Sequence, residues 1–334
     1  MNKKEHFNIS SADKAVQQMN MLGKNCTPFL FIIDYKAKNV IILSDNKIDN
    51  SKILFQFEKS KNSTDNSFST DIKYIKFEKN PIKKANYIKK FNIVTSEIHK
   101  GNSFLTNLTQ PTPIHINLSL QDIFYHSKAK FKLWLKDWFV VFSPEIFVKI
   151  EDGKISSYPM KGTIDANFPD AENIILNSEK EKAEHATIVD LIRNDLSMVA
   201  DDVEVKRFRY IEKIRTNQTD LLQVSSHIEG KLPENYKDNL GEIIFKLLPA
   251  GSISGAPKPK TLEIIETAEN YERGFYTGIC GYFDGKNLES AVMIRFIEQT
   301  ADGLVFKSGG GITFQSNAEK EYEELIQKVY VPIY

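Results

Sequence analysis

The fold class can be inferred from residues 130–163, which read KFKLWLKDWFVVFSPEIFVKIEDGKISSYPMKGT. Runs rich in β-branched and aromatic residues predict strands at 130–135, 138–142, 146–150 and 154–158. Lys136-Asp137 and Glu151-Asp152-Gly153 supply turns between neighbouring strands. Because the spacing leaves no room for the helical crossovers that parallel strands need, the sequence predicts an antiparallel sheet here.

The flanking sequence combines further strands with helices. Strand patterns occur at 29–34, 40–43, 53–57, 103–108, 203–214, 221–228, 277–283, 290–298 and 303–307. Helical patterns occur at 81–101, 178–200, 236–248, 259–270 and 317–329. The chain shows no internal repeat and no low-complexity linker, so we expect one large α+β domain, an α/β sandwich. Residues 1–100 form its N-terminal part, and residues 101–334 form its core.

Composition is that of a soluble globular protein. The 334 residues are 41% hydrophobic and 26% charged, and Lys plus Arg equals Asp plus Glu at 44 each. This balance favours neither nucleic acid nor an anionic membrane as a partner. Cys26 and Cys280 fit neither a disulfide framework nor a metal site. We find no signal-peptide core and no bilayer-spanning run, so we expect a cytoplasmic protein.

Lys161 lies at the end of the quoted stretch, in Pro159-Met160-Lys161-Gly162-Thr163, which the pattern predicts to be a short loop. A lysine between proline and glycine has a constrained backbone, and its amine can act as a nucleophile if the loop faces a cavity. An isolated lysine is more commonly solvated, because its charge is costly to bury. The sequence around Lys161 therefore leaves both interpretations open.

Several carboxylates are candidates for chemistry. Glu145 closes a predicted strand and can serve as a general acid, although exposed turn glutamates are commoner than catalytic ones. Glu184 lies at the edge of the apolar stripe of helix 178–200, and Glu321 and Glu324 share a face of helix 317–329. If Glu184 meets Glu321 in space, the oxygen ligands suit Mg²⁺. His185 indicates zinc only faintly, since it has no second ligand at the right spacing.

Two glycine-containing segments can approach an anionic ligand closely. Residues 249–258 read PAGSISGAPK and lead into a helix whose N-terminus favours negative charge. Gly309-Gly310-Gly311 carry an entropy cost that a plain hairpin does not need. For both segments, a simple turn or glycine-rich bend is the alternative.

Taken in order, these segments resemble the chorismate-utilising enzymes, from about residue 101 to the C-terminus. The resemblance implies a fold of two large antiparallel sheets flanked by helices, with residues 101–334 as the chorismate-binding catalytic core. It implies that Glu184 and Glu321 bind Mg²⁺, with Glu324 nearby. The substrate-binding positions that it implies are Thr163, Ser254, Arg295, Lys328 and the backbone of Gly309, Gly310 and Gly311.

Lys161 indicates which reaction the resemblance implies. Many aminodeoxychorismate synthases have lysine here, whereas anthranilate synthases typically have alanine. In the reaction implied, Lys161 attacks C2 of chorismate, Glu145 protonates the leaving C4 hydroxyl, and ammonia then enters at C4. Such a lysine must be neutral, so we expect its pKa to be lowered. Leu105 stands where isochorismate and salicylate synthases have a lysine that activates water.

The resemblance also implies a partner and leaves alternatives open. The chain lacks the nucleophilic cysteine elbow of a glutaminase, so a separate glutamine amidotransferase subunit is the expected source of ammonia. Ile164, Met198 and Gln223 depart from the family pattern, and Gln223 replaces a histidine linked to pyruvate elimination in anthranilate synthases. Anthranilate synthase component I and a non-catalytic chorismate-binding homologue remain the alternatives.

Overall fold

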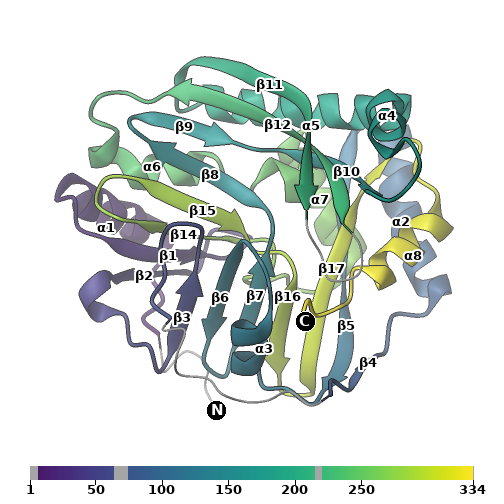
Figure 1. The fold of residues 1–334 in the computed structure, drawn as a ribbon, viewed down its shortest axis with the longest axis horizontal. Coiled ribbons are helices and arrows are strands. Elements are labelled where there is room, and N and C mark those ends of the chain that lie inside the picture. The colour runs from purple at the N-terminus through teal and green to yellow at the C-terminus, as the bar shows by residue number, and fades with distance from the viewer. Residues whose placement is uncertain (1–6, 64–73, 215–219, 334) are drawn as a thin grey trace.

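The computed structural model describes residues 7–63, 74–214 and 220–333, which form two antiparallel sheets with helices on their outer faces (Figure 1). In these residues the first sheet has nine strands. In spatial order they are β10 (Met160–Asp165), β12 (Leu221–Lys231), β9 (Lys154–Ser157), β8 (Ile146–Glu151), β15 (Leu288–Val292), β14 (Ile279–Phe283), β1 (Phe29–Ile33) and β2 (Val40–Ser44), with β11 (Asp201–Ile214) also paired to β12.

The second sheet has eight strands within the same described ranges. In spatial order they are β13 (Gly255–Ala256), β5 (Leu105–Ile116), β17 (Gly303–Thr313), β16 (Phe296–Thr300), β7 (Phe139–Ser143), β6 (Phe131–Leu135) and β3 (Ile53–Gln56), with β4 (Phe77–Lys79) paired to β5. Strands from residues 1–100 join both sheets, since β1 pairs with β14 and β3 pairs with β6. The predicted fold class is thereby confirmed, while a division at residue 100 stays a prediction.

Helices complete the layers. They are α1 (Ala12–Lys24), α2 (Lys84–His99), α3 (Leu120–His126), α4 (Ala171–Asn177), α5 (Glu179–Ser197), α6 (Leu240–Lys246), α7 (Lys258–Glu269) and α8 (Ala318–Gln327), with short 3₁₀ turns η2 (Asp45–Lys47), η3 (Tyr236–Asn239) and η4 (Gly251–Ile253). Figure 1 shows α2 and α8 beside β17 and β5. None of the helices in the described residues has the length and apolar character needed to cross a membrane.

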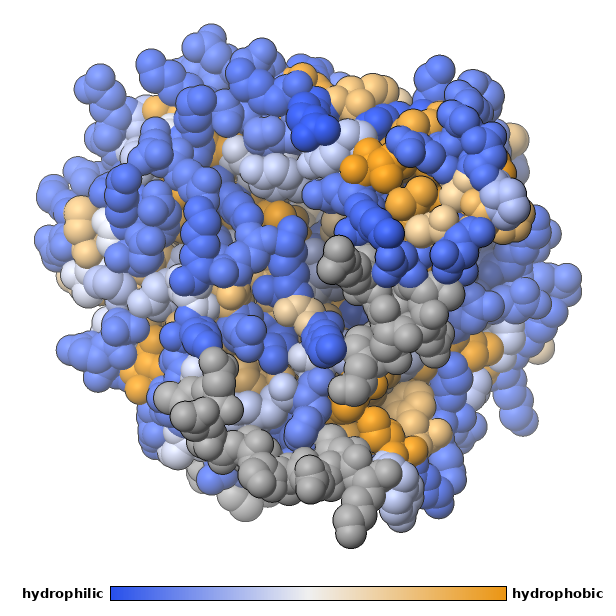
Figure 2. All heavy atoms as spheres, viewed as in Figure 1, coloured by the Kyte–Doolittle hydropathy of each residue, from blue (hydrophilic) through white to orange (hydrophobic). Residues whose placement is uncertain are grey.

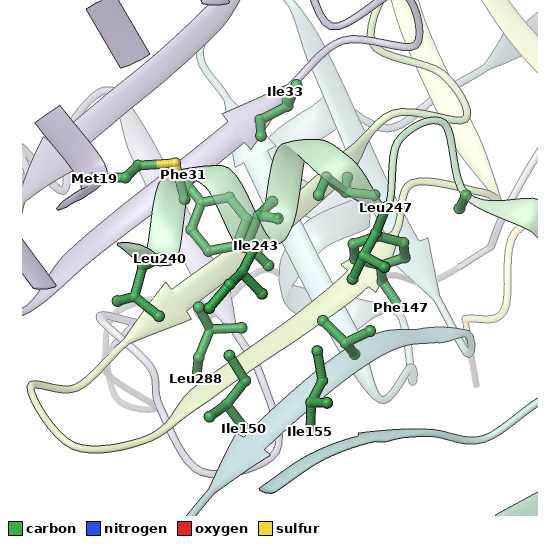
Figure 3. Packing of buried hydrophobic residues seen from close by; sticks show 14 of the residues in the cluster. Met19, Phe31, Ile33, Phe147, Ile150, Ile155, Leu240, Ile243, Leu247 and Leu288 are labelled. Atoms are coloured by element: carbon green, nitrogen blue, oxygen red, sulfur yellow. The ribbon is translucent and has the colours of Figure 1, made fainter. Parts of the chain in front are cut away.

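Strand alternation explains how one strand serves two cores. Phe29, Phe31 and Ile33 of β1 point to the outer face of the first sheet and join a hydrophobic cluster to which α1, α5 and α6 contribute. Figure 3 shows the α6 side chains, among them Leu240 and Ile243, directed at this face. Leu30 and Ile32 point the other way, into the layer between the two sheets. In contrast to these buried layers, the surface seen in Figure 2 is mostly hydrophilic, with hydrophobic residues in separate patches.

The prediction of one sheet for residues 130–158 is wrong. The four strands form, but β6 and β7 belong to the second sheet and β8 and β9 to the first. The chain changes sheet at Ser143-Pro144-Glu145, where Pro144 has no N–H for a sheet ladder and the Ser143 hydroxyl donates to Val292 O (2.7 Å). Four strands close in sequence therefore serve two layers.

The single strand predicted at 290–298 is also wrong, because it is divided into β15 and β16 in different sheets. The return crossing lies at Met293-Ile294-Arg295, where Arg295 has a φ of 55°. The two crossings touch, since Val292 N–H donates to Glu145 O (3.1 Å) and Phe142 N–H donates to Arg295 O (3.1 Å). Backbone hydrogen bonds thereby hold Glu145 and Arg295 at the same junction.

Two loop predictions are wrong as well. Lys161 lies in strand β10, which pairs with β12 through a register shift between Met160 and Thr163, so the predicted loop is a bulged edge. The glycine-rich bend at Gly309–Gly311 is part of strand β17. The helical predictions are confirmed within a few residues at their ends, with the 236–248 helix beginning as η3, whereas α1 has no predicted counterpart.

Phe139 provides a test of the layer between the sheets. Its side chain is fully buried and its ring stacks on Phe296 with centroids 4.7 Å apart. We expect Phe139→Ala to lower the free energy of unfolding by about 3–5 kcal/mol, because it leaves a cavity between the two sheets. Phe168→Ala is the matched control, since Phe168 is 56% exposed, and we expect a change within about 0.5 kcal/mol. Urea denaturation followed by circular dichroism measures both, and equal effects would contradict the layer assignment.

Candidate active site

Two adjoining cavities lie where the chain crosses between the sheets. The first encloses about 330 Å³ and has mostly apolar walls from β8, α5 and Leu247, which follows α6, with Lys161 and Glu184 among its lining residues. The second encloses about 230 Å³ and is lined by polar side chains and by the glycines of β17. The residues that line both are Glu145, Met160, Ser252 and Gly311. Glu145 is the only one of these four that carries an ionisable group.

The backbone around Glu145 is fixed by the crossing itself. Its N–H donates to the Ser143 hydroxyl (3.1 Å), and its carbonyl accepts from Val292 N–H (3.1 Å). Its carboxylate accepts a hydrogen bond from the Ser252 hydroxyl in η4. The carboxyl group is therefore held at the point where the two cavities meet.

The environment of Glu145 favours the protonated acid. Burial raises the pKa of its carboxyl, and this effect outweighs the Ser252 hydrogen bond and the positive charges of Arg295 and Lys328, which lower it. A carboxyl with a raised pKa retains its proton at higher pH and suits a general acid. The structure thus brings the predicted acid into a cavity and gives it the matching electrostatics.

Lys161 reaches the first cavity from β10. Gly162, with a φ of 87°, follows it in the bulge, and the Lys161 side chain is 33% exposed. Its Nζ lies 2.8 Å from Glu184 Oε2. Burial by itself lowers the pKa of Lys161, but the ion pair and hydrogen bond with Glu184 and the charges of Glu181 and Glu324 reverse this and raise it. Our prediction that the pKa of Lys161 is lowered is therefore wrong for this arrangement.

The carboxylates expected to bind Mg²⁺ come from two helices. Glu184, on α5, is 15% exposed and lines the first cavity. Glu321, on α8, accepts from the Ser316 hydroxyl (2.8 Å) and lies beside β17, since a Cβ on Gly310 would be 3.5 Å from its Oε2. Glu184 pairs with Lys161, and Glu321 is close enough for the charge of Lys161 to act on it. They supply carboxylate oxygens around a cation, although no group of three or more His, Cys, Asp or Glu in the described residues is arranged to hold a metal.

The second cavity has a cationic wall. Arg295, Lys307 and Lys328 line it, and Lys328 Nζ donates to Gly309 O (3.0 Å) while pairing with Glu324 (2.7 Å). The glycines of β17 lie between this wall and β5. A Cβ on Gly310 would make an ordinary contact with Lys328 Nζ at 3.6 Å, whereas one on Gly309 would clash with Thr109 of β5, 2.5 Å from its Cγ2. The cavity therefore suits an anion that approaches the backbone of β17.

Residues 8–333 match the family model described as chorismate binding enzyme. The chain belongs to the chorismate-binding enzyme family. A Haemophilus influenzae protein named "Uncharacterized PabA-like protein" is 52% identical over 324 residues, which cover 97% of this chain and 98% of that protein. Anthranilate synthase component 1 of Saccharolobus solfataricus is 31% identical and matches 90% of this chain and 70% of its own length. Aminodeoxychorismate synthase component 1 of Salmonella typhimurium is 32% identical, matching 74% of this chain and 56% of its own.

Solved structures agree on the fold. The menaquinone-specific isochorismate synthase of Escherichia coli superposes with a TM-score of 0.71 at 14% identity, covering 96% of this chain and 82% of its own. Anthranilate synthase component I of Streptococcus pneumoniae gives a TM-score of 0.65 at 26% identity, covering 77% of this chain and 59% of its own. The family match and the sequence relatives confirm the expected resemblance to chorismate-utilising enzymes, and these structures confirm the fold.

Not every predicted residue of this chorismate-binding enzyme lines a cavity. Ser254 is fully buried, and its hydroxyl donates to Ala250 O (2.9 Å). Thr163 is exposed on β10 and lies outside both cavity walls. His185 is buried, and its Nε2 lies 2.7 Å from the Ser226 hydroxyl, so this nitrogen is engaged in a hydrogen bond. The substrate-binding roles of Ser254 and Thr163 therefore have no support from their positions.

Sequence reasoning missed several residues that line the second cavity, among them Ser252, Lys307 and Thr277. Ser252 lies two positions before Ser254 in the same small-residue turn. Sequence reasoning therefore selected the right segment, but it chose the hydroxyl of Ser254 when that of Ser252 lines the cavity. Lys307 lies just before the glycines of β17, which are themselves a signal. Thr277 has a φ of 62°, a strained backbone for a β-branched residue, and nothing in its local sequence indicates this.

The Ser252 hydrogen bond to Glu145 can be tested directly. Because this bond stabilises the carboxylate, we expect Ser252→Ala to move the titration of Glu145 to higher pH. Infrared difference spectroscopy can follow the protonated carboxyl band, assigned as the one lost in Glu145→Gln. Ser127→Ala, buried outside both cavities, is the control. A titration unchanged by Ser252→Ala would contradict the contact.

Proposed function

We propose that this chorismate-binding enzyme is an aminodeoxychorismate synthase component I, which makes 4-amino-4-deoxychorismate from chorismate and ammonia for 4-aminobenzoate and folate synthesis. The observation that carries the proposal is that a lysine amine and a carboxyl with a raised pKa, Lys161 and Glu145, line the same cavity. A nucleophile and a general acid in one cavity are what displacement of a hydroxyl by an amine needs.

The charges of the second cavity support an anionic substrate. Chorismate carries two carboxylates, and Arg295, Lys307 and Lys328 line this cavity. Arg295 and Lys328 are close enough to Glu145 to affect its pKa. We propose that these cations hold substrate carboxylates with the ring beside Glu145 and with C2 towards Lys161.

The proposed reaction has two displacements. The Lys161 amine first bonds to C2, the ring double bonds shift, and the C4–O bond breaks, with the oxygen leaving as water after taking the proton of Glu145. Ammonia then bonds to C4, the double bonds shift back, and the C2–N bond to Lys161 breaks. The proton that ammonia loses returns Glu145 to its acid form. Before the first displacement Lys161 has to leave Glu184 and give up one proton to solvent water, because the two form an ion pair in this structure. The second displacement releases Lys161 as the neutral amine, so this proton is lost only once.

Two side chains disfavour the competing reactions. Leu105 lines the first cavity where a lysine would activate water, and an aliphatic side chain cannot serve as a base. Gln223 lines the second cavity where a histidine would assist pyruvate elimination. Both substitutions favour simple amination over hydration or anthranilate formation. Ile164 and Met198 lie outside both cavity walls.

Glutaminase activity is proposed to reside in a separate subunit. In this chain Cys280 is buried, and burial raises the pKa of its thiol, which makes it a poor nucleophile. Cys26 is exposed and lies outside both cavities. Ammonia released from glutamine by a partner, or ammonium in solution, would be the amine source.

The direct experiment is a coupled assay. Purified protein is incubated with chorismate, Mg²⁺ and an ammonium salt, and the lyase that releases 4-aminobenzoate is then added. The proposal predicts 4-aminobenzoate that depends on ammonium and on this lyase. Anthranilate as the sole product would assign the chain to anthranilate synthesis, and chorismate binding without turnover would make it a non-catalytic homologue.

Lys161 can be tested without the lyase. With chorismate and Mg²⁺ but no ammonia, we expect mass spectrometry to find an adduct of chorismate minus water on the peptide that contains Lys161. Lys161→Ala should abolish this adduct and product formation. Lys154→Ala on β9, whose side chain is 56% exposed and paired with Glu229, is the matched control and should retain both. An adduct on any other residue would contradict the nucleophilic role.

Mg²⁺ is the proposed cofactor, held by Glu184 and Glu321 with Glu324 nearby. The ammonium of Lys161 already occupies a place among these carboxylates, which indicates a site that attracts a cation. When bound, Mg²⁺ would supply positive charge to orient a substrate carboxylate.

We expect Glu321→Gln to weaken Mg²⁺ binding about 10–100-fold, because it removes a charged ligand. Isothermal titration with MgCl₂ alone measures this without turnover. Glu319→Gln, on the same helix but paired with Lys84 (2.9 Å), is the matched control. Equal affinities for the two variants would rule out Glu321 as a ligand.

A further inference from the structure

Asn107 has a buried amide oxygen to which the reaction described above gives no role. The residue lies in β5 and lines the second cavity. Its backbone is committed, since its N–H donates to Ser254 O (2.9 Å) and its carbonyl accepts from Arg273 Nη2 (2.7 Å). Among the described residues, its side-chain Oδ1 is buried and has no hydrogen-bond partner. A buried acceptor without a partner costs about 1–3 kcal/mol, so its presence in a cavity wall points to a ligand.

The sheet register explains why this amide faces the cavity. Asn107 is directly opposite Gly311 of β17, and opposite residues of an antiparallel pair project from the same face. Gly311 has no side chain to cover that face and lines both cavities. Leu105, two residues before Asn107 and therefore on the same face, lines the first cavity. Leu105 and Asn107 thus present an aliphatic and a polar side chain to adjoining parts of the site.

A buried ion pair holds Asn107 in place. Arg273 and Glu269 are each 2% exposed, and Arg273 Nη2 lies 2.6 Å from Glu269 Oε1 while it also binds Asn107 O. The same guanidinium donates to Ile253 O (3.0 Å), next to Ser252. The backbone of Asn107 is therefore held by buried neighbours within a strand.

The chemistry of the second cavity defines what the oxygen can bind. Arg295, Lys307 and Lys328 offer only hydrogen-bond donors, so they suit carboxylates and cannot orient an amine. Ammonia has three N–H groups that need an acceptor and one lone pair that must point at carbon. An uncharged amide oxygen accepts from N–H without protonating the lone pair. Asn107 Oδ1 meets this requirement in the wall of the cavity that Glu145 also lines.

We propose that Asn107 binds the incoming ammonia and directs its lone pair at C4. This inference rests on the proposed function. The nucleophile must arrive at the carbon from which the hydroxyl departs, so its site has to adjoin Glu145. Lys161 lines only the first cavity and Asn107 only the second, with Glu145 in both. The covalent intermediate thus has Lys161 on one side of the ring and ammonia on the other. As in the second displacement above, the bond from ammonia to C4 forms and the C2–N bond to Lys161 breaks.

The test separates ammonia binding from chorismate binding. In Asn107→Leu, which removes the acceptor, we expect the KM for ammonia to rise about tenfold, while the KM for chorismate stays within about twofold. The Lys161 adduct should still form, and it should accumulate during turnover because its capture by ammonia is slowed. Asn107→Gln keeps an uncharged amide oxygen and should bring the KM for ammonia back towards that of the parent protein.

Asn102→Leu is the matched control, since its amide donates to Glu97 (2.6 Å) and lies outside both cavities. If Asn107→Leu lowers the melting temperature, Asn107→Ala replaces it and is judged by the same ratios. An unchanged KM for ammonia, or an equal rise in both KM values, would overturn the role of Asn107 while leaving the proposed function standing. A parent protein that forms neither adduct nor aminated product would overturn both.

Discussion

The pair of backbone crossings between the sheets is the constraint on which the site depends. Ser143 and Val292 are tied by a side-chain hydrogen bond, and Glu145 and Val292 by a backbone one, so the two crossings cannot move independently. One crossing carries Glu145 and the other ends at Arg295. Because each chain segment leaves one sheet and enters the other here, a polar junction opens inside an otherwise apolar sandwich. The two sheets thereby fix the backbone positions of Glu145 and Arg295.

Charge is divided across this junction. On one side, the carboxylates of α5 and α8 surround Lys161 and keep it in an ion pair with Glu184. On the other side, lysines and an arginine line a cavity beside the glycines of β17. Glu145 lies between them as an acid whose pKa burial has raised. A dianionic substrate would satisfy the cationic side, and a divalent cation would compete with Lys161 for Glu184.

Local sequence predicted the elements better than their assembly. Alternation and turn residues located nearly every strand, yet residues 130–158 divide between two sheets because of hydrogen bonds to Val292, far away in sequence. Motif resemblance found Lys161, Glu145, Glu184 and Arg295, which do reach the site. It favoured Ser254 over Ser252, since the side-chain direction in a 3₁₀ turn is set by packing. The free amide oxygen of Asn107 depends on its strand register against Gly311, which no local pattern records.

The most direct measurement of the central claim is a crystal structure of the protein with chorismate and Mg²⁺ in the absence of ammonia. The account predicts Lys161 Nζ bonded to C2 or within about 3.5 Å of it, released from Glu184, with Glu145 beside the C4 oxygen or the place it has left. A bound chorismate whose C2 faces another residue, with Lys161 still paired to Glu184, would contradict the claim that this lysine directs amination to C4.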